Sequence, residues 1–200
     1  EAFANMSKFR WELDVLYNGV YINATRVPWH YIPVWFIITT PPLFVVAGIA
    51  GMGTATWGIL RCKRPLPLSV KAAAFSLAGF LLPLLSVIIL RSVVYDSWRH
   101  LYFIYGPFVV LAAGALHWMS NRFSRPTMII LSLVMVVPPL LFQIAAHPFQ
   151  YVYFSPFARA GENELRFKYE MDYWGVGYKQ ALEYVLEIDS SKVIPIAAQN

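Results

Sequence analysis

The residues best suited to chemistry form a short charged segment at 95–103, Tyr-Asp-Ser-Trp-Arg-His-Leu-Tyr-Phe, between two long apolar runs. Arg99 and His100 stand side by side in it, directly after Trp98. If both apolar runs cross a bilayer, these side chains lie at one membrane surface, where cations attract lipid phosphate and aromatic rings occupy the headgroup region. The segment therefore predicts contact with a lipid phosphate. The alternative is a loop with ordinary interfacial anchors, because arginine near a helix end often reaches to the membrane surface.

Two other segments of the chain carry the same types of residue. Arg91 precedes the charged segment, and Arg26 and His30 lie near the start of the chain beside Trp29. We predict that the cations and one tryptophan of these segments bind substrate. The predicted binding residues are Arg99, His100, Arg91, Arg26, His30 and Trp98. Aromatic belts occur at both faces of ordinary membrane spans, so a coincidental grouping is the alternative.

Carboxylates that could act as a general base are scarce in the apolar part of the chain. Asp96 is a weak candidate, and a structural ion pair with Arg99 or Arg91 is the favoured interpretation of it. Asp172 is expected to cap or turn the chain before a helix. The motifs of soluble enzymes and the spacing of zinc ligands are missing, so the sequence calls for no metal and no cofactor.

The composition indicates a membrane protein, because 58% of the 200 residues are hydrophobic and only 14% are charged. A soluble domain of this size usually carries about 25% charged residues. Four apolar runs are long enough to cross a bilayer. They cover residues 33–60, 68–90, 101–119 and 127–146. Pro41-Pro42 in the first run either kinks the helix or marks where a surface segment turns into the span.

The charges are distributed unevenly between the connecting segments. The loops at 61–71 and 120–126 contain six arginines and lysines and no acid, while all 11 acids lie elsewhere. Short loops rich in lysine and arginine face the cytoplasm, which predicts that both chain ends are extracytoplasmic. The predicted location is a multi-pass position in a bacterial inner or plasma membrane, or in the endoplasmic reticulum membrane. This distribution indicates membrane topology and not nucleic-acid binding.

The predicted architecture is an all-α membrane protein with a short extracytoplasmic α/β tail. Its parts are an interfacial segment, a transmembrane region and a tail, at 1–32, 33–146 and 147–200. We expect an interfacial helix over 1–17, a turn at Asn18-Gly19, a helix over 178–187 and a strand over 192–198. The tail is expected to be cut short, so the remainder of the same polypeptide is an expected partner.

Four stretches of the chain carry a resemblance when they are taken together. They are Pro-Trp-His-Tyr-Ile-Pro-Val-Trp with the following Ile-Thr-Thr-Pro in 28–41, Trp-Arg-His-Leu-Tyr-Phe at 98–103, His-Pro-Phe-Gln-Tyr-Val-Tyr-Phe at 147–154 and Asp-Tyr-Trp-Gly at 172–175. In this order they resemble the polytopic membrane glycosyltransferases that use polyprenyl-phosphate sugars, which are related to protein O-mannosyltransferases and aminoarabinose transferases. Each stretch is weak alone, and together they cover most of the chain. Ser155 stands where the family usually has asparagine.

The resemblance implies a C-type glycosyltransferase fold and inverting transfer of a sugar from a polyprenyl-phosphate carrier on the extracytoplasmic side, without a metal. It also implies that Arg99 and His100, with Arg26, Arg91 or His30, hold the donor phosphate. Membrane lipid and the polyprenyl-phosphate sugar are the implied partners. The family's catalytic acid lies in an earlier outer loop that has no counterpart in this sequence. Whether this chain is an enzyme therefore stays open, and the chain alone is expected to be inactive.

Two other classes of protein fit the same features. A transporter or flippase fragment would also have proline-bearing spans, although its polar groups would lie at the bilayer midplane and not at one face. A noncatalytic membrane subunit would also lack the acidic loop.

Overall fold

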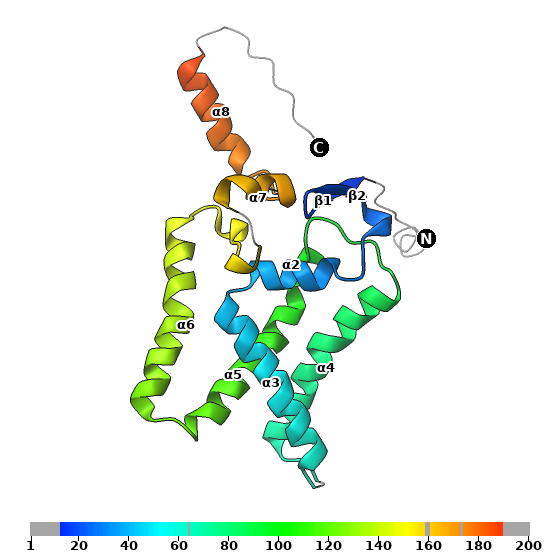
Figure 1. The fold of residues 1–200 in the computed structure, drawn as a ribbon, viewed down its shortest axis with the longest axis vertical. Helices are drawn as coiled ribbons and strands as arrows, with labels where there is room; N and C mark the ends of the chain where they lie inside the picture. Colours follow the sequence, from blue (N-terminus) through cyan, green and yellow to red (C-terminus); the bar gives the residue numbers. More distant parts are fainter. Residues whose placement is uncertain (1–12, 64, 159–160, 173, 190–200) are drawn as a thin grey trace.

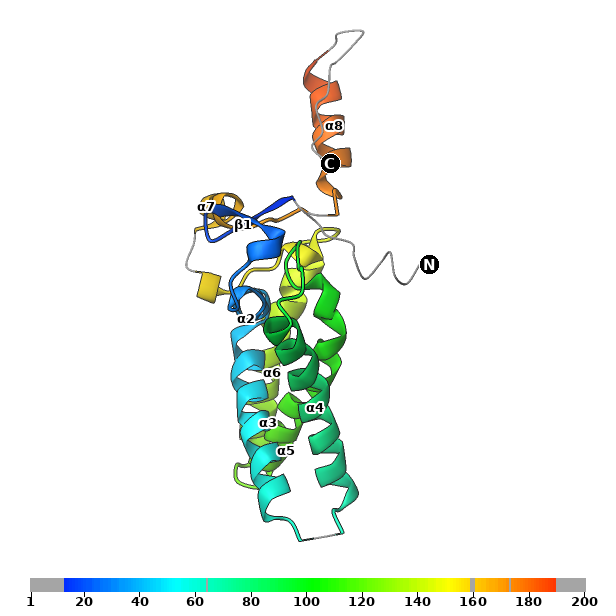
Figure 2. The same ribbon diagram turned by 90° about the vertical axis from the view of Figure 1, so that its right-hand side faces the viewer.

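A computed structural model describes residues 13–63, 65–158, 161–172 and 174–189, and its main feature is four long antiparallel helices (Figures 1 and 2). The helices are α3 (Pro42–Arg61), α4 (Leu68–Ile89), α5 (Tyr105–Ser120) and α6 (Arg125–Ala145). By length and composition, four helical segments in the described residues suffice to cross a membrane, the third counted from Arg99 through α5. The predicted fold class is confirmed.

The first predicted span, 33–60, is divided in the structure, which agrees with the second of the two alternatives for Pro41-Pro42. The chain forms α2 (Tyr31–Thr39), leaves the helical conformation at Thr40 and re-enters it in α3. Thr40 is extended because it precedes a proline, and Pro42 fits the first turn of α3, where its missing N–H is not needed. Figure 1 shows α2 lying across the ends of the long helices. The diproline therefore marks the turn from a surface segment into the span.

The other three spans lie close to their predicted positions. A 3₁₀ helix, η2 (Arg99–Ile104), leads directly into α5, so the predicted start at Leu101 falls inside this segment. Prolines occur inside α4, at Pro83, and inside α6, at Pro138 and Pro139, without ending either helix. The loops that connect α3 to α4 and α5 to α6 lie at the end of the bundle opposite α2 (Figure 1). The acid-free loops therefore share one end.

The predicted interfacial helix over 1–17 is wrong in the part that the structure describes, and its first twelve residues lie outside the described residues. Strand β1 (Asp14–Tyr17) pairs antiparallel with β2 (Val20–Asn23). The predicted turn at Asn18-Gly19 closes this hairpin, and both residues have positive φ, 52° and 83°. Asparagine and glycine tolerate this conformation, so the two residues favour a tight hairpin over a continued helix.

Short helices lie above the bundle. One of them, η1 (Ala24–Arg26), follows the hairpin. The others belong to the tail and are η3 (Gln150–Val152), η4 (Pro156–Ala158), α7 (Glu162–Lys168) and α8 (Gly177–Ile188). The predicted helix over 178–187 is confirmed by α8, whereas α7 was not predicted. The Asp172 carboxylate accepts hydrogen bonds from the backbone N–H groups of Val176 and Gly177, at 3.0 and 2.8 Å. Asp172 therefore caps α8, as expected. The predicted strand over 192–198 lies outside the described residues.

Small residues bring α3 and α5 together. Gly48, Gly51 and Ala55 are buried along one face of α3. A Cβ atom at Gly48 would collide with the Phe108 ring, and one at Gly51 would collide with the Leu111 carbonyl. The two backbones can approach closely only because these side chains are absent.

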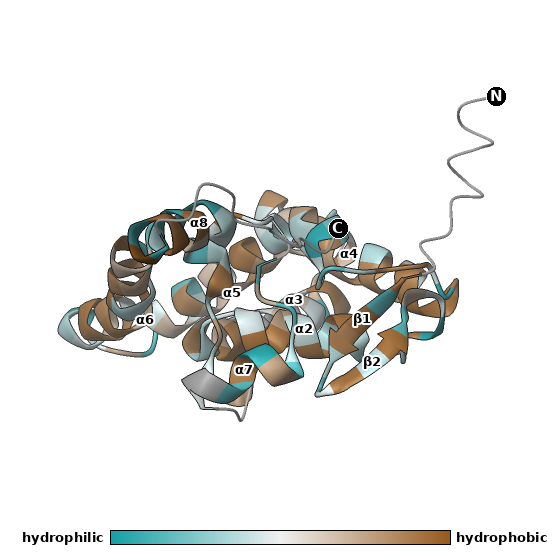
Figure 3. Ribbon diagram, turned by 90° about the horizontal axis from the view of Figure 1, so that it is seen from above, coloured by the Kyte–Doolittle hydropathy of each residue, from teal (hydrophilic) through white to brown (hydrophobic). Residues whose placement is uncertain are grey.

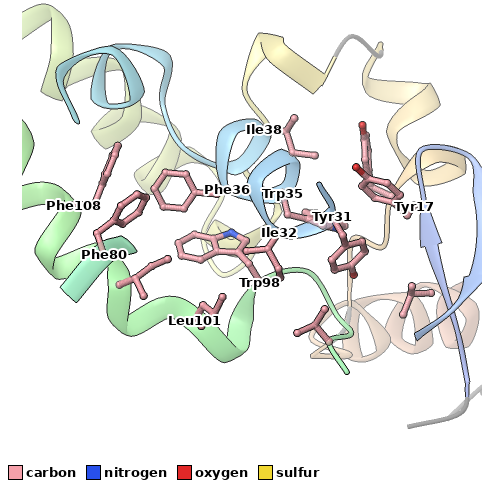
Figure 4. Packing of buried hydrophobic residues seen from close by; sticks show 14 of the residues in the cluster. Tyr17, Tyr31, Ile32, Trp35, Phe36, Ile38, Phe80, Trp98, Leu101 and Phe108 are labelled. Atoms are coloured by element: carbon pink, nitrogen blue, oxygen red, sulfur yellow. The ribbon is translucent and has the colours of Figure 1, made fainter. Parts of the chain in front are cut away.

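An aromatic core fixes α2 to the long helices (Figure 4). Phe36 of α2 packs edge-on against Phe80 of α4, Trp98 and Phe108 of α5, with ring centroids 5.4, 5.0 and 4.8 Å apart. Edge-to-face pairs at these distances add stabilisation beyond the area that they bury. Seen from above, α2, α7 and the hairpin cover this end of the bundle (Figure 3).

Candidate functional site

Three of the four stretches that carry the family resemblance line one cavity, with a volume of about 330 Å³. We call it the aromatic cavity. The lining residues that come from these three stretches are Trp35, Thr39, Pro41, Trp98, Tyr102, Gln150, Tyr151, Tyr153 and Phe154. The fourth stretch joins them through Asp172, which accepts a hydrogen bond from the Tyr151 hydroxyl. Segments that are far apart in the sequence therefore build one site.

The end of α2 holds these segments in place. Trp98 Nε1 donates a hydrogen bond of 2.8 Å to Thr39 Oγ1, which in turn donates to the Trp35 carbonyl at 2.6 Å. The backbone N–H of Ser155 donates to the Ile38 carbonyl at 2.7 Å. Trp98 is only 6% exposed and lines the cavity, so its hydrogen bond to Thr39 anchors the cavity wall.

Glu170 stands in the wall between the aromatic cavity and a second, more open cavity of about 740 Å³. Its Oε1 accepts a hydrogen bond from the Leu16 backbone N–H at 3.2 Å, and its buried Oε2 has no hydrogen-bond partner within the described residues. Burial raises the pKa of Glu170 to about 7, with the nearby Asp96 charge adding to the rise, whereas the Leu16 hydrogen bond and Arg99 act against it. A carboxyl group with this pKa can take up and release a proton near neutral pH.

Sequence reasoning missed Glu170 because its environment is made by distant segments. In the sequence it is one acid among several in a polar tail. The antiparallel bridge between Tyr17 and Tyr169 brings it beside β1, where it is half-buried. No local pattern in the tail signals this pairing with the hairpin.

Arg99 and Asp96 line the second cavity, which we call the outer cavity. Arg99 Nη2 lies 2.8 Å from Asp96 Oδ2, which is the ion pair expected from the sequence. The guanidinium also lies over the rings of Tyr95 and Trp174, 4.9 and 5.6 Å from their centroids. Burial raises the pKa of Asp96, although Arg99 and His100 pull it down. Asp96 therefore acts here as a partner of Arg99.

Arg26 and Arg91 line a third cavity of about 420 Å³, between η1 and the end of α4. We call it the basic cavity. The residues that line it include no acid. Arg99 does not belong to it, so the structure divides the predicted phosphate-binding cations between two places.

The two predicted histidines lie apart from these cavities. His30 Nδ1 lies 2.7 Å from the Tyr17 hydroxyl. Burial raises the pKa of Tyr17 to about 12, so its hydroxyl stays protonated and can donate to the imidazole. His100 is exposed, and its ring packs edge-on against Tyr95 with centroids 4.7 Å apart. Their predicted role in substrate binding stays a prediction.

A metal centre has no candidate ligands in the part of the chain that the structure describes, where no three His, Cys, Asp or Glu residues gather. Comparison of the chain with protein-family models, with curated proteins and with solved structures gave no match.

Proposed function

We propose that the chain is the carboxy-terminal part of a membrane glycosyltransferase that transfers a sugar from a polyprenyl-phosphate carrier to an acceptor on the extracytoplasmic face. One observation carries the proposal. Three of the four stretches that resemble such enzymes line the aromatic cavity and the fourth is hydrogen-bonded to its wall, although together they span residues 28 to 175 of the sequence. A resemblance arising by chance would have no reason to gather in one site.

The composition of the aromatic cavity suits a sugar. Its walls combine aromatic rings with Gln143, Gln150 and Glu170, and none of the described residues that line it is an arginine or lysine. Rings pack on the apolar faces of a pyranose, while amides and carboxylates bind its hydroxyl groups.

Glu170 and Arg99 have separate roles in the proposed transfer, as proton acceptor and as the cation for the leaving phosphate. In this proposal the acceptor oxygen attacks the anomeric carbon and gives its proton to Glu170, which takes the place of the outer-loop acid that the resemblance implies, and the bond from that carbon to the phosphate oxygen breaks. The lipid phosphate leaves with the electron pair. Arg99 lines the outer cavity together with Glu170, and its guanidinium stabilises the negative charge that develops on the leaving phosphate.

The placement of charge favours this function over transport. Charged residues of the described long helices lie near the loop end, at Arg61, Lys71 and Arg125, and not in the middle of the spans. A transporter would need polar groups near the bilayer midplane. The acid-free loops at that end support an extracytoplasmic position for the cavities at the other.

Donor consumption tests the proposal. Membranes that contain the full-length protein are incubated with polyprenyl-phosphoryl mannose or glucose, and released polyprenyl phosphate is measured by mass spectrometry. We expect release with one of these donors and a loss of about 100-fold in Glu170→Gln, the usual size of a general-base contribution. Glu187→Gln, an exposed position on α8, is the control. Release equal to that of membranes without the protein would refute the proposal.

A further inference from the structure

The basic cavity has a chemistry that the proposed transfer does not use. We propose that Arg26 and Arg91 form a binding site for the phosphate group of a membrane lipid, separate from the aromatic cavity. The inference stands independently of the proposed function, because it depends only on the geometry of these residues.

The charges of the basic cavity are available to an anion. Within the described residues, neither Arg26 nor Arg91 takes part in an ion pair, whereas Arg99 is paired with Asp96. Both arginines are exposed, and the hydroxyl-bearing Thr25 and Ser92 line the same cavity. Two guanidinium groups with nearby hydroxyls match a phosphate, since each planar fork donates two hydrogen bonds to its oxygens.

The backbone at Arg91 keeps its side chain at the end of α4. Ser92 N–H donates to the Val87 carbonyl at 3.1 Å and Arg91 N–H to the Ile88 carbonyl at 3.3 Å, which closes the helix with a Schellman turn. Arg91 has a φ of 48° at the position that glycine usually occupies. The last carbonyls of the helix are therefore satisfied by the turn, and the arginine side chain is not needed to cap them.

The surroundings of the cavity indicate that the phosphate belongs to a lipid. Val87 and Ile88 form an apolar wall of the cavity, and the adjacent Ile89 and Leu90 are each 74% exposed. This apolar surface continues down α4, a helix able to cross a membrane. Trp29, 71% exposed, lines the same cavity and suits headgroup depth. A lipid could thus place its phosphate on the arginines and its chains along α4.

Helix α2 separates this cavity from the aromatic cavity. Tyr31 and Ile32, at the start of α2, line the basic cavity. Trp35 and Thr39, further along the helix, line the aromatic cavity. A lipid phosphate on Arg26 and Arg91 would therefore not occupy the space that we assign to the sugar.

The site can be tested by counting bound lipid. The chain is reconstituted in phosphatidylcholine discs doped with phosphatidylglycerol or with undecaprenyl phosphate, and retained lipid is measured by native mass spectrometry. We expect one saturable phosphate-bearing lipid, bound about 10-fold to 100-fold more weakly in Arg91→Gly and in Arg26→Gln, as for the loss of a charge-assisted hydrogen bond. Arg91→Gly suits the turn, so thermal unfolding should show an intact fold. Arg122→Gln, on an exposed arginine over Trp118 beyond α5, is the matched control.

Comparison of undecaprenyl phosphate, phosphatidylglycerol and inorganic phosphate shows which phosphate-bearing molecule the site binds. Stronger retention of undecaprenyl phosphate supports the site and identifies the sugar carrier as its ligand, and equal retention supports a site for anionic lipids in general. Inorganic phosphate that displaces the lipid with equal affinity would overturn the lipid assignment. Retention unchanged in Arg91→Gly and Arg26→Gln, or reduced as much in Arg122→Gln, would overturn the site. Lipid retention without donor consumption would refute the proposed function alone.

Discussion

The carboxylate of Glu170 accepts a hydrogen bond from the backbone N–H of Leu16, although the two residues lie 154 positions apart. This bond joins the hairpin to the wall between the aromatic and outer cavities. It satisfies only one oxygen of a carboxyl group that burial keeps partly protonated at neutral pH. The hairpin therefore controls the electrostatic state of the most chemically promising acid in the described residues.

The raised pKa of Glu170 predicts a pH-dependent stability. The folded-state pKa of about 7 exceeds the unfolded value of 4.5, so the folded chain holds the proton more tightly and becomes less stable as the pH rises from 4.5 through 7. Asp96 reinforces this trend and Arg99 opposes it. Glu170→Gln should be more stable than the wild type at pH 8 by about 1 kcal/mol, a value reduced for solvent screening, or about 2–4 °C in Tm.

Thermal unfolding at pH 5 and pH 8 checks this prediction. Glutamine keeps an oxygen that can accept the Leu16 hydrogen bond, so the variant removes the charge and little else. Glu187→Gln, exposed on α8, should leave the pH dependence of the wild type unchanged. A Glu170→Gln variant that is less stable than the wild type at pH 8 would contradict the prediction.

The contact between α3 and α5 predicts that Gly51→Ala is destabilising. The new methyl group would meet the Leu111 carbonyl, which is backbone and cannot turn aside. The expected loss is about 1–3 kcal/mol, the usual cost of overpacking. Gly53→Ala is the control, because nothing lies within 4 Å of its added methyl group and alanine favours a helix. Unfolding in detergent compares the two variants, and equal stability would show that α3 and α5 do not pack this closely.

Replacement of Arg99 separates phosphate binding from loop anchoring. If Arg99 stabilises the leaving phosphate, Arg99→Ala should lower donor turnover by about 30-fold to 1000-fold, or about 2–4 kcal/mol, and Arg99→Lys should recover only part of the activity. Turnover and Tm are measured at matched protein levels beside Asp96→Asn. Equal losses of activity and of Tm in Arg99→Ala and Asp96→Asn would instead assign Arg99 to the loop alone.

The left-handed backbone at Arg91 predicts an unusual response to substitution. Arg91→Gly should raise the free energy of unfolding relative to Arg91→Ala by about 1 kcal/mol, because glycine adopts a positive φ without steric cost. Chemical denaturation of the two variants measures the difference. Equal stabilities would show that the turn after α4 is relaxed in the wild type.

Cysteine labelling tests the orientation of the chain. In a Cys62→Ser background, Thr25→Cys should react with an impermeant maleimide in intact cells, and Ser124→Cys should react only after permeabilisation. Both positions are exposed and lie at opposite ends of the helices. The reverse pattern, or equal labelling of both, would contradict extracytoplasmic cavities.

The long helices could be predicted from the sequence because burial in lipid demands uninterrupted apolar runs, and the structure has such helices near all four positions. Local turns and caps could also be predicted from the sequence, as at Asn18-Gly19 and at the Asp172 cap. The sequence left two geometries open at Thr40, since Pro41-Pro42 is compatible with a kinked helix and with a turn between two helices. Glu170 could not be found, because its burial depends on a tertiary contact between the hairpin and the tail. Likewise, only the fold shows that Arg26 and Arg91 share one cavity and Arg99 lies in another.

Helix α6 supplies one wall of the aromatic cavity and is scarcely buried against the other helices. Among its described residues, only Met135 is buried, and the ribbon in Figure 3 shows that most residues of α6 are hydrophobic. Pro139 and Gln143 of this helix line the cavity, and the proline pair at 138–139 removes backbone hydrogen bonds from the segment just before them. In a bilayer, the tilt of such a helix adjusts to the thickness of the hydrocarbon layer. We therefore expect the width of the cavity to follow the lipid composition of the membrane, with thicker bilayers straightening α6.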